Sequence, residues 1–103
     1  MKFTILDLRQ IVSRQKASTV MNKLTRDPGI TAGYRVEYVP FRSKYGTLST
    51  IRQQLNTYEI DEVIDYYENR LESAKHWHTI AGTKRYLKIF YELKDYLSQQ
   101  SVA

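Results

Sequence analysis

The sequence TILDLRQIVSRQKASTVMNKL, residues 4–24, contains two groups of apolar residues with helical spacing. On one straight helix, at about 100° per residue, the two groups would lie on nearly opposite faces. The pattern therefore predicts two helices, over 4–13 and 17–25, with Thr4 as the first N-cap and a break in 13–16 that lets both groups face one core. The groups are Ile5, Leu8, Ile11 and Val12, and then Ala17, Val20, Met21 and Leu24.

A turn and a short strand are predicted after these helices. Asp27-Pro28-Gly29 ends the second helix, because proline disfavours helical backbone in the residue before it. Apolar and charged residues then alternate over 34–38, which is typical of a half-buried strand that Pro40 limits. Residues 41–46 form a basic, aromatic loop, and 30–32 are a candidate short partner strand. The rings expected in the core are Tyr34, Tyr38 and Phe41.

The remaining chain predicts helices joined by a polar connection. A helix from about Thr47 is predicted by the helical spacing of Leu48, Ile51, Leu55 and Tyr58. The next helix is predicted by the same spacing in Ile60, Val63, Ile64, Tyr67 and Leu71. Residues 76–82 connect to a last helix capped by Thr83, and His76, Trp77 and His78 are expected to cover the end of the core. That helix buries Tyr86, Leu87, Phe90, Leu93 and Leu97. We expect one α+β domain over 1–103, mostly helical with a small β element, comprising a basic half (4–46) and a helical half (47–98).

Composition excludes several classes of protein. The 103 residues suffice for one domain, and the absence of cysteine rules out disulfides and thiolate metal sites. No apolar run approaches the roughly 18 residues of a membrane span. The first residues do not have the pattern of a signal or transit peptide, so the expected compartment is the cytoplasm.

The positive charge is concentrated in the first half of the sequence. Through Tyr58 there are ten Lys or Arg against three acids, a net +7, whereas six bases face eight acids afterwards, a net −2. Clustered cations neutralise phosphates and release condensed counterions. The asymmetry favours nucleic acid as the partner, with DNA expected rather than RNA.

The order helix, turn, helix and strand resembles helix-turn-helix and winged-helix DNA-binding domains. Residues 6–12, 13–16 and 17–24 carry the resemblance, and the strand over 34–39 takes the place of a wing. No stabilising helix precedes the pair and the turn lacks glycine, so an ordinary helical hairpin with a solvated basic face is the alternative. The resemblance implies that the second helix reads bases in the major groove through Lys16, Ser18, Thr19, Asn22 and Lys23. Phosphates would be held by Arg14, Arg26, Arg35, Arg42 and Lys44.

A second resemblance concerns origin. Residues 64–68 and 86–97, rich in tyrosine, are similar to segments of small bacteriophage proteins associated with DNA replication or regulation. We therefore expect a phage-encoded, DNA-binding accessory or regulatory protein in replication or transcription control, with no catalytic residues and no cofactor.

Two other functions stay open. The acidic helix 59–72 carries carboxylates that can bind Mg²⁺, although a solvent-exposed outer face explains the same spacing more simply. The helix is also a candidate docking face for a basic protein or a second copy of the chain. A protein-binding regulator or inhibitor is thus the first alternative. The second is a small ribonuclease toxin using His76 or His78; no third metal ligand accompanies these histidines at recognisable spacing.

Overall fold

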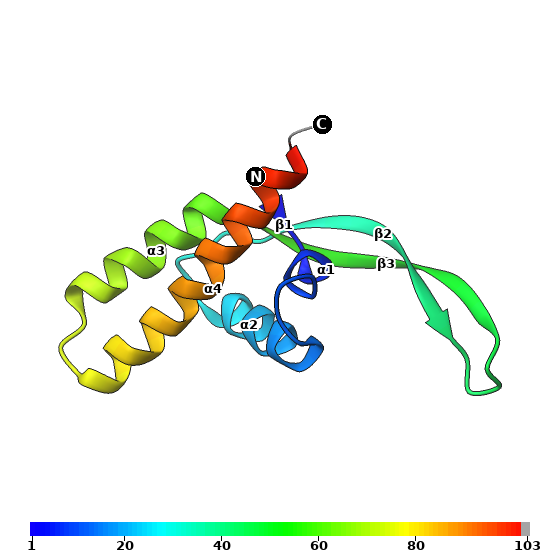
Figure 1. The fold of residues 1–103 in the computed structure, drawn as a ribbon, viewed down its shortest axis with the longest axis horizontal. Coiled ribbons are helices and arrows are strands. Elements are labelled where there is room, and N and C mark those ends of the chain that lie inside the picture. Colours follow the sequence, from blue (N-terminus) through cyan, green and yellow to red (C-terminus); the bar gives the residue numbers. More distant parts are fainter. Residues whose placement is uncertain (102–103) are drawn as a thin grey trace.

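The computed structural model describes residues 1–101, which form a helical body and a projecting β-hairpin (Figure 1). The predicted fold class, mostly α with a small β element, is confirmed. The longest dimension, 51 Å, follows from the hairpin, which extends away from the helices. The elements are β1 (Lys2–Phe3), α1 (Ile5–Leu8), α2 (Arg14–Arg26), β2 (Gly33–Arg42), β3 (Leu48–Glu59), α3 (Ile60–Ser73) and α4 (Trp77–Ser101).

The first two helices are separate, as the two apolar groups predict. Thr4 accepts a hydrogen bond from the Leu6 amide at 3.2 Å, and Asp7 accepts one from the Thr4 amide at 2.9 Å, so a capping box starts α1. The break lies earlier than predicted, between the end of α1 and Ser13. Ser13 caps α2 by accepting a hydrogen bond from the Lys16 amide at 3.2 Å. Residues 14–16, predicted to be the break, are therefore the first turn of α2.

Replacing Ser13 with alanine is expected to lower the free energy of unfolding by about 1 kcal/mol, because the capped amide loses its partner. Urea denaturation followed by circular dichroism measures the change. Ser98→Ala, on the exposed surface of α4, is the matched control and should change stability by less than about 0.5 kcal/mol. Equal effects of the two substitutions would show that the cap does not stabilise α2.

The helix predicted from Thr47 is wrong, because residues 48–59 form strand β3. β3 pairs antiparallel with β2 from Gly33↔Thr57 to Arg42↔Leu48, so the predicted partner strand over 30–32 is also wrong. Pro40 does not end β2, since it lies opposite Thr50 within the pairing. A proline is tolerated there because β2 is an edge strand of the sheet.

The base of the hairpin joins the helical body through β1. Lys2 pairs with Glu59 and Phe3 with Tyr58, giving the strand order β1-β3-β2. β3 leads directly into α3, and α3 packs antiparallel to α4 (Figure 1). The sheet, α2 and the α3–α4 pair therefore meet at one end of the hairpin, and the other end projects.

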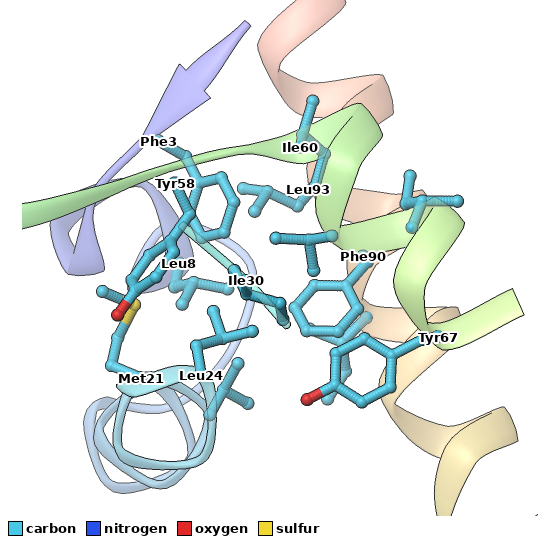
Figure 2. Packing of buried hydrophobic residues seen from close by; sticks show 14 of the residues in the cluster. Phe3, Leu8, Met21, Leu24, Ile30, Tyr58, Ile60, Tyr67, Phe90 and Leu93 are labelled. Carbon is cyan, nitrogen blue, oxygen red and sulfur yellow. The ribbon is translucent and has the colours of Figure 1, made fainter. Parts of the chain in front are cut away.

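The core fills the space where these elements meet (Figure 2). Phe3 and Tyr58 come from the paired strands, and their ring centroids lie 6.1 Å apart. The Phe90 ring of α4 stacks on the Tyr67 ring of α3 at 5.3 Å. The apolar stripe of α2 closes the core from the third side, because its residues Ala17, Val20, Met21 and Leu24 are all buried. The stripes predicted for α3 and α4 are buried in the core except for Leu71 and Tyr86, which are half-buried and pack against it.

Three expectations about the connection predicted over 76–82 are corrected. Helix α4 begins at Trp77, so most of the predicted connection is helical. Thr83 is not a cap but a buried residue inside α4. His76, Trp77 and His78 do not cover the core: all three are exposed, Trp77 to 73%. The helical spacing of apolar residues continues through Ile80. Polar residues on both sides of Ile80 hid this pattern in the sequence.

Candidate nucleic-acid interface

Helix α2 presents a polar face opposite its buried stripe. Ala17, Val20 and Leu24 are at most 1% exposed, so residues halfway around the helix point to solvent. Amide and guanidinium side chains on such a face match the hydrogen-bonding groups of base edges. The exposed residues of this outward face are Gln15, Thr19, Asn22 and Arg26.

The charge of α2 is entirely positive, since its charged residues are Arg14, Lys16, Lys23 and Arg26. Arg14 and Lys16 lie in the first turn, where the helix dipole already favours anions over cations. Ser13 satisfies one amide of that turn, and other amides stay available. This end of α2 is therefore suited to an oxyanion such as a phosphate.

Two of the residues predicted to read bases do not lie freely in solvent. Lys23 is half-buried, with its Nζ 5.2 Å from the centre of the Tyr86 ring and 5.8 Å from that of Tyr67. Ser18 is also half-buried, and the Thr19 hydroxyl donates a hydrogen bond to the Gln15 carbonyl at 3.1 Å. Within α2 the exposed predicted residues are therefore Arg14, Lys16, Thr19, Asn22 and Arg26.

The distal half of the hairpin forms a second basic region. Residues 38–52 contain Arg42, Lys44 and Arg52 and no acid. Arg42 donates from Nη1 to the Gly46 carbonyl at 3.1 Å, and Gly46 has a φ of 82°, which closes the turn. Lys44 lies 5.2 Å from the ring centre of Tyr45, which is 83% exposed. The tip thus presents cations and an aromatic ring together.

The remaining predictions for the hairpin divide. Arg35 is paired with Glu37, with 3.5 Å between Nη1 and Oε1, so its charge is partly neutralised. Tyr34, Tyr38 and Phe41 are not core residues, being 69%, 70% and 45% exposed. They lie on a two-stranded ribbon that no helix covers over most of its length (Figure 1). Alternation along a strand therefore did not indicate burial here.

A groove separates α2 from the hairpin. It has a volume of about 670 Å³, and its lining includes Arg14 and Asn22 from α2 and Phe41, Ile51 and Gln53 from the hairpin. In Figure 1 the tip of the hairpin bends toward the side of the molecule on which α2 lies. The two basic regions therefore flank one concave surface.

Negative charge is located on the other side of the helical body, along α3. This helix contains five acids and one base, Arg70. Asp61 forms an ion pair with Lys94 at 2.7 Å. The hydrogen-bonded ammonium lowers the pKa of Asp61, and the carboxylate in turn raises the pKa of Lys94. Glu68 accepts a hydrogen bond from the Tyr91 hydroxyl at 2.6 Å, which raises the pKa of Tyr91. Glu62 accepts a hydrogen bond from the Thr31 amide at 3.3 Å, so three carboxylates of this helix are engaged within the chain.

One further carboxylate, Asp27, attaches the end of α2 to α3. It accepts a hydrogen bond from the Tyr67 hydroxyl and lies 3.6 Å from Arg70. Burial, together with this carboxylate, raises the pKa of Tyr67 well above its usual range, so the phenol stays protonated. The contact fixes the C-terminal end of α2, whose outward face is therefore held in one orientation relative to the body.

Other candidate sites gain no support from the structure. No group of three histidine or acidic side chains within residues 1–101 is placed to hold a metal ion. His78 packs against the exposed Trp77 ring, with centroids 4.1 Å apart. In the same part of the chain, no helix has both the length and the hydropathy that crossing a bilayer requires.

Sequence reasoning missed two residues of the basic surface. Gln15 lies on the outward face with Asn22 and Arg26, and its spacing of seven and eleven residues from them was the available signal. Arg52 was placed on a helix, so its position beside Tyr38 on the hairpin was hidden. No protein family, curated protein or solved structure matches this chain.

Proposed function

We propose that this chain binds duplex DNA and acts as an accessory or regulatory protein in replication or transcription control. Helix α2 enters the major groove, and the hairpin tip contacts phosphates beside it. The observation that carries the proposal is that the only charged side chains of α2 are four cations, on a helix whose outward face is polar and exposed. The proposed role is binding, with no catalytic step.

The outward face of α2 suggests how bases are read. Asn22 and Gln15 match adenine, which offers one acceptor and one donor in the major groove, and Arg26 matches the two acceptors of guanine. Arg14 and Lys16 then bind phosphate at the helix N-terminus, which accounts for cations where the dipole disfavours them. Lys23 is assigned a packing role over Tyr67 and Tyr86 instead of a base contact.

The dimensions of the hairpin support its role as a wing. A strand of ten residues such as β2 extends about 34 Å, which is close to one turn of B-DNA. With α2 in the groove, the projecting tip contacts the backbone beside it. Arg42 and Lys44 at the tip provide the charges for this contact.

Salt dependence tests the phosphate contacts. Duplex affinity should fall steeply between about 50 mM and 200 mM salt, and Arg42→Gln with Lys44→Gln should make the log–log slope shallower by about 1.8, or 0.9 for each lost contact. Fluorescence anisotropy with a labelled duplex measures both. Lys75→Gln with Lys84→Gln is the control, because it removes the same charge from exposed positions on α4 and the turn before it.

The control variant should keep the wild-type slope. A slope that changes equally in both variants would show that net charge acts and the hairpin tip does not. No measurable affinity for any duplex at about 50 mM salt would contradict the proposal itself.

A further inference from the structure

The hairpin has a second face, of which the proposed duplex contact uses only Arg42 at the tip. In an antiparallel pair, directly opposed residues point to the same side, and neighbours along a strand point to opposite sides. The side that carries Val39 and Leu55 packs toward the helices, and both residues are buried. The other side, here named the outer face, consists of Tyr34, Val36, Tyr38, Pro40 and Arg42 of β2 and Leu48, Thr50, Arg52, Gln54 and Asn56 of β3.

Two tyrosine rings dominate the outer face. Tyr34 and Tyr38 are 69% and 70% exposed, with Val36 between them at 39%. Within residues 1–101 neither ring stacks on another aromatic ring, in contrast to Tyr67 and Tyr86 of the core. The two tyrosines are four residues apart on one strand, so their Cα atoms are about 13 Å from each other. They form an open platform whose apolar surface is left exposed by the residues that the structure describes.

The polar residues around this platform have the chemistry of a nucleotide site. Arg52 lies directly opposite Tyr38, Gln54 opposite Val36, and Asn56 opposite Tyr34. Arginine binds phosphate, and amides bind base edges. The ten residues of the outer face include no carboxylate, because Glu37 lies on the other side and pairs with Arg35. An anionic ligand with flat apolar rings satisfies both the charge and the exposed tyrosines.

We propose that the outer face binds unpaired nucleotides of single-stranded nucleic acid, with bases stacked on Tyr34 and Tyr38 and the backbone held by Arg52. A second copy of the chain is a poorer occupant, because two outer faces in a symmetric contact would bring arginines against arginines. Tyr34, Tyr38 and Arg52 do not line the groove beside α2, whereas Pro40, Gln54 and Asn56 of the same face do. Stacking on the two tyrosines therefore does not depend on duplex binding. One molecule can thus hold a duplex and an adjacent unpaired strand.

The test compares single-stranded and duplex DNA on the same variants. The single-stranded probe is a labelled oligothymidylate of about 12 nucleotides, within the span that such sites occupy. Tyr34→Ala with Tyr38→Ala should weaken its binding about tenfold or more and leave duplex affinity within about twofold. Trp77→Ala is the matched control, since it removes a ring of similar exposure, 73%, from the α3–α4 turn. It should change neither affinity.

An abasic oligonucleotide of the same length separates stacking from charge. Wild type should bind it about tenfold more weakly than oligothymidylate, because its phosphates remain but its bases are gone. Equal affinity for the two probes, or an unchanged affinity of the tyrosine variant, would overturn the inference. So would sedimentation showing that the tyrosine substitutions convert a dimer to a monomer without affecting oligothymidylate.

The two proposals fail differently. Wild type that binds duplex and not oligothymidylate refutes the outer-face site alone. Wild type that binds oligothymidylate through the tyrosines and no duplex refutes the role of α2 alone. Asn22→Ala with Arg26→Ala, which alters only α2, should reduce duplex binding and preserve the binding of the single strand.

Discussion

Replacing Asn22 and Arg26 together with alanine is expected to weaken binding to a preferred duplex by about 30-fold or more. Each side chain is placed to form a bidentate contact with a base, and each such contact contributes about 1–3 kcal/mol of discrimination. Both residues are exposed, so their removal should leave the fold intact. The duplex is first selected from a random library by the wild-type chain, and affinities are then measured by fluorescence anisotropy.

The control for this prediction removes similar groups from outside helix α2. Asn69→Ala with Lys75→Ala deletes one amide and one cation that are also exposed. This variant should keep wild-type affinity for the selected duplex. The Asn22 and Arg26 variant should retain much of its affinity for unrelated duplexes, because Arg14 and Lys16 remain. An equal loss on all duplexes would show that these two residues hold phosphates and do not read bases.

Replacing Phe90 with alanine is expected to lower the free energy of unfolding by about 3–5 kcal/mol, a large part of the stability of a small domain. Phe90 is 0% exposed, and its ring centroid lies 5.3 Å from that of Tyr67 and 6.4 Å from that of Tyr86 in a cluster of three rings. Truncation leaves a cavity where α3 and α4 meet, and the aromatic stacking is lost. Urea denaturation followed by circular dichroism gives the change in unfolding free energy.

Two further substitutions bound this result. Phe90→Leu keeps most of the buried volume and should cost clearly less than alanine. Trp77→Ala removes a larger ring that is 73% exposed and should change stability by less than about 0.5 kcal/mol. A loss below about 1 kcal/mol for Phe90→Ala would mean that the α3–α4 contact is not the main source of stability.

The misassigned segment 48–58 shows where periodicity is ambiguous. Leu48, Ile51, Leu55 and Tyr58 fit helical spacing, yet on β3 they divide between the two sides of the ribbon. The competing signals were the β-branched residues of this segment and the glycine-containing turn before it, following directly on an alternating strand. Pairing with β2 supplies hydrogen bonds for the backbone of this segment. The apolar spacing within 48–58 carries no information about that neighbouring strand.

The candidate interface was predicted in part. The two apolar groups predicted α2 without its first turn, and its buried stripe implied the exposure of Asn22 and Arg26. The position of Lys23 outside the buried stripe of α2 predicts an exposed side chain. Rings from α3 and α4, however, pack beneath its ammonium group. Local spacing gives the direction of a side chain from its own helix, whereas its surroundings come from distant segments.

Patterns carried within ten to twenty residues were enough to establish the two-helix start, the core stripes of α3 and α4, and the concentration of cations before Tyr58. These features depend on helical geometry and on charge, which neighbours in the chain share. The projecting hairpin, the exposure of Tyr34 and Tyr38, and the groove beside α2 arise from contacts between segments far apart in sequence. Whether a side chain is buried, and what it contacts, depends on that packing. A strand with one alternating sequence is half-buried where a helix covers it and exposed on both sides where no helix does.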